Sequence, residues 1–142
     1  MGTNFARLAI RLLVSANLLY AAIFLKFAGV PGSVILFTQM SQVVHGLIPQ
    51  PVFRLGSGVF ETTVAVLFLI PTTASLGARL VILWMIAIIL SHMFVLGFGL
   101  FFVDALVLML LAVSYLLLAR RQSQGDGSKN LRTMAAVQTH NK

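Results

Sequence analysis

The chain has 142 residues, of which 59% are apolar and only 9% are charged. Because a soluble domain of this length carries about 25% charged residues, the composition excludes a water-soluble monomer and indicates a membrane protein. The chain contains no cysteine, which excludes disulfide exchange, thiolate-bound zinc and cysteine-ligated iron–sulfur clusters. The net charge of +7 does not indicate a nucleic-acid partner, since the basic residues flank apolar runs instead of gathering on a polar face.

Four apolar runs have about the length needed to cross a bilayer, at residues 8–28, 55–70, 80–97 and 98–119. Lipid offers the backbone no hydrogen-bond partners, so each span must be helical. The expected fold is therefore all-α, a bundle of four transmembrane helices that forms one domain over residues 1–121. The first run resembles a signal peptide, but it has no small-x-small cleavage site and Lys26 closes it, so we expect a retained helix.

The 26 residues between the first two spans are too many for a tight turn. Within them, apolar residues recur at helical spacing opposite polar ones, at Phe37, Met40, Val44 and Leu47. This pattern predicts an amphipathic helix over about residues 33–46, lying in the outer membrane interface and ended by the prolines that follow.

After Arg121 the sequence becomes polar and basic. This composition predicts a flexible tail over residues 122–142 that is disordered when free. We expect the tail to attach the protein to a larger membrane complex.

An even number of spans places both termini on the same side of the membrane. That side, with the loop between the second and third spans, holds eight basic residues: Arg7, Arg11, Arg79, Arg120, Arg121, Lys129, Arg132 and Lys142. The opposite side holds only Lys26 and Arg54. Because cytoplasmic loops carry the excess of Lys and Arg, the termini are predicted to be cytoplasmic, in the inner membrane of a bacterial cell.

Each predicted span contains one ionisable residue near its outer end: Lys26, Glu61, His92 and Asp104. At about 1.5 Å rise per residue, the last three lie roughly 7 to 10 Å inside the membrane. Charge at that depth is costly and by default indicates function. Lys26 can pair with Glu61, Asp104 can accept a hydrogen bond from His92, and the hydroxyls of Ser91, Thr62 and Thr63 could add further bonds.

Two interpretations of this polar layer remain open. It could hold the headgroup of a quinone or another small amphiphile and exchange protons with it, because His titrates near neutral pH. It could equally be a set of polar contacts that hold the helices together, with no ligand. Haem or a chlorin bound to His92 is disfavoured, because a lone histidine is more often simply hydrogen-bonded and the other histidine near a span is His45 in the interfacial segment. No metal site is predicted, and Trp84 is interpreted as a packing or lipid-facing residue.

Short motifs along residues 7–120 resemble the DoxX-like family of small four-helix integral membrane proteins. They are Lys26-Phe27-x-Gly29-x-Pro31, Gly58-x-x-Glu61, Leu69-Ile70-Pro71 and Ser91-His92-x-x-Val95-Leu96-Gly97. The family takes its name from a small subunit linked to quinone-dependent sulfur oxidation, and most members have no assigned activity. The resemblance implies membrane residence and a quinone as the ligand to test, and it carries over to Lys26, Glu61 and His92. The chain departs from the family in having Thr72 where many relatives have arginine, and Asp104 rests on the depth argument alone.

The absence of soluble-enzyme motifs favours a role without catalytic activity of its own. The leading hypothesis is a non-catalytic small subunit of a membrane redox assembly with a quinone or lipid-headgroup pocket. The alternative is a purely structural accessory subunit of a large respiratory or photosynthetic complex.

Overall fold

The computed structural model describes the backbone of residues 2–140 and the side chains of residues 3–122 and 124. Every secondary-structure element in this part of the chain is a helix, which confirms the all-α fold. The elements are α1 (Gly2–Tyr20), which continues as the π-helix η1 (Ala21–Phe27), then α2 (Pro31–Val43), α3 (Gln50–Leu69), α4 (Ala74–Ser91), which continues as the π-helix η2 (His92–Leu96), and α5 (Leu100–His140).

Four helical segments of the described chain are long and apolar enough to cross a membrane: Thr3–Phe27, Gln50–Leu69, Ala74–Leu96 and Leu100–Gln122. Their outer faces carry large apolar side chains, of which Leu83 is 62% exposed, Phe94 80% and Leu110 62%. A surface this apolar is stable only against lipid or a protein partner. The protein is therefore a multi-pass membrane protein.

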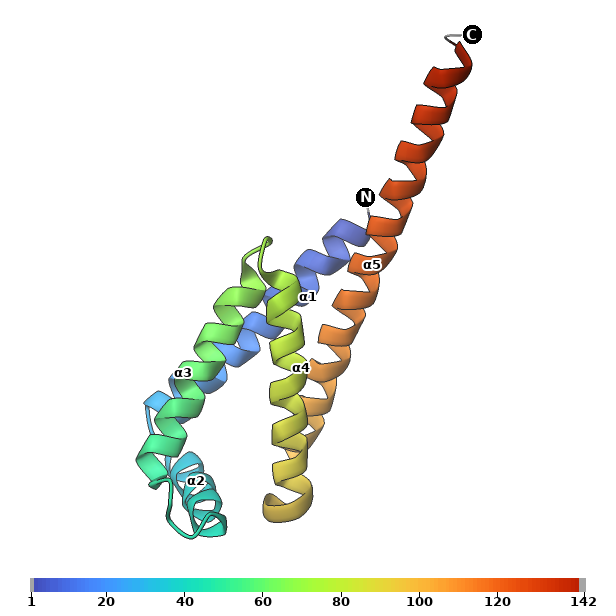
Figure 1. Ribbon diagram of the computed structural model, residues 1–142. Helices are drawn as coiled ribbons and strands as arrows, with labels where there is room; N and C mark the ends of the chain where they lie inside the picture. The colour runs from blue at the N-terminus through green and yellow to red at the C-terminus, as the bar shows by residue number, and fades with distance from the viewer. Residues whose placement is uncertain (1, 141–142) are drawn as a thin grey trace.

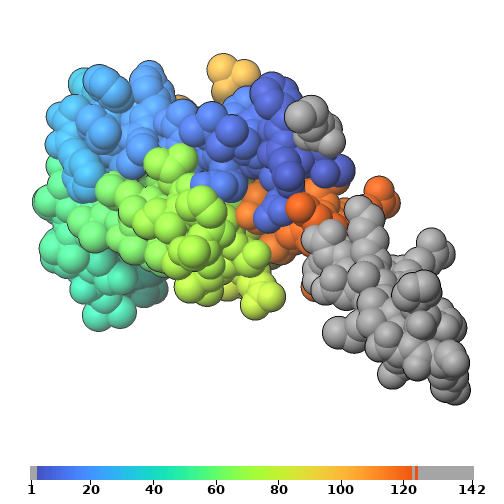
Figure 2. Space-filling view, turned by 90° about the horizontal axis from the view of Figure 1, so that it is seen from above, coloured from blue at the N-terminus to red at the C-terminus, as the bar shows by residue number. Residues whose placement is uncertain are grey.

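The four spans form a closed ring in which α1 packs against α3 and α5, and α4 packs against the same two helices. Figure 2 shows α1 in blue against the green of α3 and the orange of α5. In Figure 1 the N-terminus, the turn between α3 and α4, and the projecting part of α5 lie towards one end of the bundle. The helix α2 lies at the other end, beside the start of α3 and η2.

The helices of the ring approach each other most closely where α3 crosses α4. A Cβ atom added at Gly77 would lie 2.5 Å from the backbone N and Cα of Phe68, so only glycine allows this approach. The Phe68 ring meets the Tyr115 ring edge-on at 5.0 Å, and both side chains are fully buried. This packing holds α3, α4 and α5 together near the terminal end.

Two arginines satisfy the carbonyl groups that a helix leaves unpaired at its C-terminal end. Arg11 of α1 donates to the carbonyl oxygens of Phe68, at 3.1 Å, and of Leu69, at the end of α3. Arg54 of α3 donates in turn to the carbonyl oxygen of Lys26 at the end of η1. Each positive charge also opposes the negative end of a helix dipole. The two helices thus cap each other.

The helices of the first three spans begin earlier than predicted, the first of them at Gly2 instead of Leu8. The second span starts at Gln50 instead of Leu55, because Pro51 lies in the first helical turn, where its missing N–H costs nothing. The third starts at Ala74 instead of Leu80, because the small residues Ala74, Gly77 and Ala78 are buried against α3 instead of forming a loop.

The flexible tail predicted after Arg121 is also not what the structure contains. The helix α5 begins at Leu100 and continues to His140, well beyond the apolar span. A helix that is already nucleated gains one hydrogen bond for each added residue, so it extends into polar sequence more easily than a new helix forms there. Residues 141–142 of the predicted tail lie outside the described residues.

Candidate functional site

A partly open cavity of about 500 Å³ is lined by all four spans, by the π-turns η1 and η2 and by α2. Its wall contains all four ionisable residues singled out from the sequence, Lys26, Glu61, His92 and Asp104. The rest of the wall is mainly apolar, with contributions from Leu18, Leu36, Met85, Ile88 and Leu108. A largely apolar cavity with a few polar groups is the usual form of a small-molecule site.

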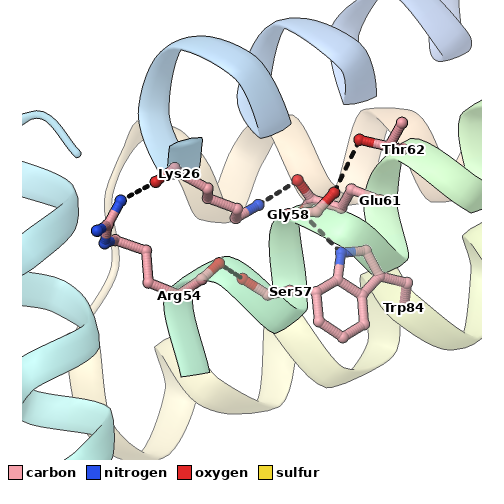
Figure 3. Close-up of polar contacts among 7 residues, drawn as sticks. All are labelled: Lys26, Arg54, Ser57, Gly58, Glu61, Thr62 and Trp84. Carbon is pink, nitrogen blue, oxygen red and sulfur yellow. Dashed lines mark hydrogen bonds and ion pairs between the residues drawn. The ribbon is translucent and has the colours of Figure 1, made fainter. Parts of the chain in front are cut away.

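Lys26 and Glu61 form a buried ion pair between η1 and α3, as predicted (Figure 3). Glu61 is 1% exposed and Lys26 is 9% exposed. The indole Nε1–H of Trp84 donates to Oε1 of Glu61 at 2.8 Å, so the carboxylate has partners from two other helices. A buried charge is tolerated only with such pairing and hydrogen bonding.

Three local features of the fold place Lys26 against Glu61. The π-turn, in which the N–H of Ala28 donates to the carbonyl of Ile23 at 3.0 Å, adds a residue to the helical turn and so changes the direction in which Lys26 points. Arg54 holds the end of that turn. Gly58 lets it approach α3, since a Cβ there would lie 2.8 Å from the Phe27 ring.

His92 and Asp104 do not form the hydrogen bond that was predicted between them. The Nδ1 atom of His92 lies 2.9 Å from the carbonyl oxygen of Ile88, one turn earlier in its own helix. Asp104 accepts a hydrogen bond from the Nδ2 atom of Asn17 in α1, at 3.1 Å. His92 is therefore bonded within its own helix, and Asp104 is bonded to the neighbouring helix α1.

The bond to Ile88 fixes the chemistry of His92. A carbonyl oxygen can only accept, so Nδ1 carries the proton and Nε2 of the neutral ring presents a lone pair. The residue is 6% exposed and lines the cavity. Among the described side chains, the one hydrogen bond of the His92 ring is made by Nδ1, which leaves Nε2 free for a ligand.

The three hydroxyl groups expected to extend the polar layer do not do so. Thr62, Thr63 and Ser91 each donate to the carbonyl oxygen four residues earlier in their own helix, at 2.8 to 2.9 Å. Hydroxyl side chains commonly form this bond within helices, where the acceptor is always nearby.

Two residues of the site were missed from the sequence, Trp84 and Asn17. Trp84, interpreted as a packing or lipid-facing residue, lies in the cavity wall with its N–H on Glu61. A signal was present, because Trp84, Ile88 and His92 recur at four-residue spacing and so lie along one helix face. For Asn17, the sequence signal was limited to a polar residue within an apolar run.

The helix α2 forms part of the cavity wall, which the sequence did not predict. Phe37 and Met40, two of the apolar residues that define its predicted apolar face, line the cavity. Phe37 is 8% exposed, and its ring centre lies 5.9 Å from that of Phe53 on α3. The apolar face of this short helix packs on the protein because α3 and η2 offer it an apolar surface.

Among the described residues, no three His, Asp or Glu side chains come together as metal ligands. His45, the other histidine considered for a tetrapyrrole, is exposed in the turn after α2 and does not line the cavity. The polar groups of the cavity are therefore suited to hydrogen bonding and proton exchange.

No family model, curated protein or solved structure matches this chain. The case for a function therefore depends on the geometry of the cavity and on the residue pattern of the sequence.

Proposed function

We propose that this protein binds a small amphiphile inside the membrane, a quinone being the leading candidate, and serves as a non-catalytic small subunit of a membrane redox assembly. The observation that carries the proposal is the cavity of about 500 Å³ with Lys26, Glu61, His92 and Asp104 in an otherwise mainly apolar wall. Its volume lies within the range of small-molecule sites, roughly 300 to 1,000 Å³. The resemblance to the DoxX-like family supports the same ligand and the same role.

The roles of the side chains follow from their hydrogen bonds. The Lys26 ammonium has three N–H donors, and its bond to Glu61 uses one of them, so it can donate to a headgroup oxygen. Nε2 of His92 can accept a proton or a hydrogen bond. The apolar wall suits a ring and the start of an isoprenoid chain. A bound quinone would supply two-electron, two-proton redox chemistry, with the electrons coming from a partner subunit.

We propose further that the cavity lies in the outer leaflet of a bacterial inner membrane, with both termini in the cytoplasm. The eight-to-two distribution of basic residues supports this orientation. Reporter fusions after Lys142 and within residues 38–42 should report cytoplasm and periplasm respectively. The reverse pattern would contradict the orientation but not the cavity.

A structural accessory subunit is the second candidate function, and two contacts favour it. The Lys26–Glu61 ion pair joins η1 to α3, and the Asn17–Asp104 hydrogen bond joins α1 to α5. Such contacts would hold the helices together without any ligand. This role predicts that purified protein binds no quinone at a saturable site.

A binding experiment can use the protein's own fluorescence, because Trp84 is its single tryptophan and lies in the cavity wall. Quinones quench indole fluorescence on contact. Titration with decylubiquinone in detergent should give saturable quenching above the linear quenching caused by quinone dissolved in micelles.

A blocking variant separates the two components of the quenching. Ala87→Phe adds a ring to the cavity wall and should remove the saturable part. The matched control Ala16→Phe adds the same ring at an exposed α1 position that does not line the cavity, and should leave the saturable part intact. Linear quenching that is equal in all three proteins would contradict quinone binding and favour the structural role.

A further inference from the structure

The hydrogen-bonding groups that remain free in the cavity lie on different walls, with acceptors on η2 and α5 and donors on η1 and α2. In the neutral ring of His92, Nε2 is an acceptor, because Nδ1 carries the proton that is donated to the carbonyl of Ile88. Asp104 uses one carboxylate oxygen, Oδ1, for the bond from Asn17, and the described residues provide no partner for the other. The walls formed by η2 and α5 therefore offer a ligand acceptors only.

The donors on the adjoining helix α4 already have partners. The single N–H of Trp84 is directed to Glu61, and the hydroxyl proton of Ser91 to the carbonyl of Ala87. The donors that remain are Lys26 on η1, with one bond to Glu61, and the Ser33 hydroxyl on α2, which has no partner among the described side chains. A ligand that satisfies the cavity must accept from Lys26 and also donate to His92 or Asp104.

We propose that the cavity selects the reduced, hydroxyl-bearing form of its ligand, a hydroquinone, over the oxidised quinone; this rests on the proposed ligand-binding function. A hydroquinone hydroxyl accepts one hydrogen bond through its oxygen and donates another through its proton. A quinone carbonyl only accepts, so it leaves Nε2 of His92 and the free oxygen of Asp104 without partners. A binding site built around hydrogen bonds discriminates against analogues that leave its buried polar groups unpaired.

The size of this selectivity follows from the unpaired acceptors. His92 is buried, and one buried acceptor left without a partner is sufficient for roughly tenfold weaker binding; Asp104 is only half-buried and adds less. By thermodynamic linkage, tenfold tighter binding of the reduced form raises the midpoint potential of a bound two-electron couple by about 30 mV. The protein would therefore keep its ligand reduced relative to the membrane pool.

Three ligands that differ only in the headgroup test the proposal: decylubiquinol, decylubiquinone and the dimethyl ether of decylubiquinol. The ether has the reduced ring but no hydroxyl donor. Calorimetric titration of the full-length protein under anaerobic conditions should give a dissociation constant for the quinol at least tenfold below those of the other two. Equal constants for quinol and quinone would overturn the selectivity while leaving the ligand-binding function in place. No binding of any of the three would refute the proposed function itself.

Variants then assign the selectivity to a side chain. His92→Leu removes the acceptor and should weaken quinol binding towards the value for quinone, with quinone binding little changed. The control Ser91→Ala removes a neighbouring hydroxyl that is bonded to its own helix, and should keep the preference. If the ether binds as tightly as the quinol in the wild-type protein, the donor explanation is wrong, and that result does not depend on whether His92→Leu folds.

Discussion

Removing the positive charge from the buried ion pair is the most direct test of how the site is held together. In Lys26→Met, the methionine keeps most of the volume of the lysine side chain but provides no partner for Glu61. The carboxylate, 1% exposed, would then keep only the 2.8 Å hydrogen bond from Trp84. A charge left in this position must be desolvated without compensation.

The expected magnitude follows from that uncompensated charge. Breaking a buried ion pair by removing one partner costs roughly 3 to 5 kcal/mol, whereas replacing both partners with neutral groups of similar volume is often close to neutral. Glu61→Gln should cost a similar amount, because it leaves the Lys26 ammonium alone. In the double variant the glutamine oxygen can still accept from Trp84, so most of the loss, all but about 1 to 2 kcal/mol, should be recovered.

The measurement is a double-mutant cycle on the free energy of unfolding. Reversible unfolding in mixed micelles of dodecyl maltoside and dodecyl sulfate can be followed by circular dichroism. The control Arg79→Met removes an exposed charge outside the cavity and should change stability by less than about 1 kcal/mol. The reasoning from charge pairing is refuted if the single variants lose less free energy of unfolding than this control. It is also refuted if the double variant is no more stable than the less stable single variant.

Three further predictions concern the scaffold. Gly77→Ala should destabilise the protein by about 2 to 4 kcal/mol in the same unfolding assay, because the new methyl group would overlap the α3 backbone. The control Gly56→Ala, with open space around it, should be neutral or stabilising. Equal effects of the two variants would contradict the close crossing of α3 and α4. Arg11→Ala should cost about 1 to 2 kcal/mol by leaving the end of α3 uncapped, compared with little change for Arg79→Ala. Deletion of residues 123–142 should leave the bundle folded but reduce co-purification of partner subunits from native membranes, and an unchanged yield of the same subunits would exclude the tail as their attachment site.

The sequence determined the class of fold, because the lipid environment restricts the backbone so strongly. Four apolar runs, two of which are residues 8–28 and 98–119, are long enough to cross the membrane. A segment of this length that crosses the membrane must be helical. The sequence also identified Lys26, Glu61, His92 and Asp104, because ionisable groups are rare in such runs and stand out against them. All four residues line one cavity.

The partners of these residues were decided by the tertiary structure. Glu61 pairs with Lys26 as charge alone predicts, but its second partner, Trp84, depends on the rotation of α4 against α3. The expected bond between His92 and Asp104 is absent from the described residues, and the two groups are bonded instead to the Ile88 carbonyl and the Asn17 amide. Depth along a helix can be counted from sequence, but rotation about the helix axis cannot, because one residue changes it by about 100°.

The two π-turns and the start of α4 were also decided by the tertiary structure. The turns at η1 and η2 redirect Lys26 and His92, and no composition signal marks them. The early start of α4 depends on Gly77 packing against Phe68, which is a contact between two helices and not a property of either. Composition and charge therefore decide that the chain enters the membrane as helices, while the close packing between helices decides which side chains face the cavity.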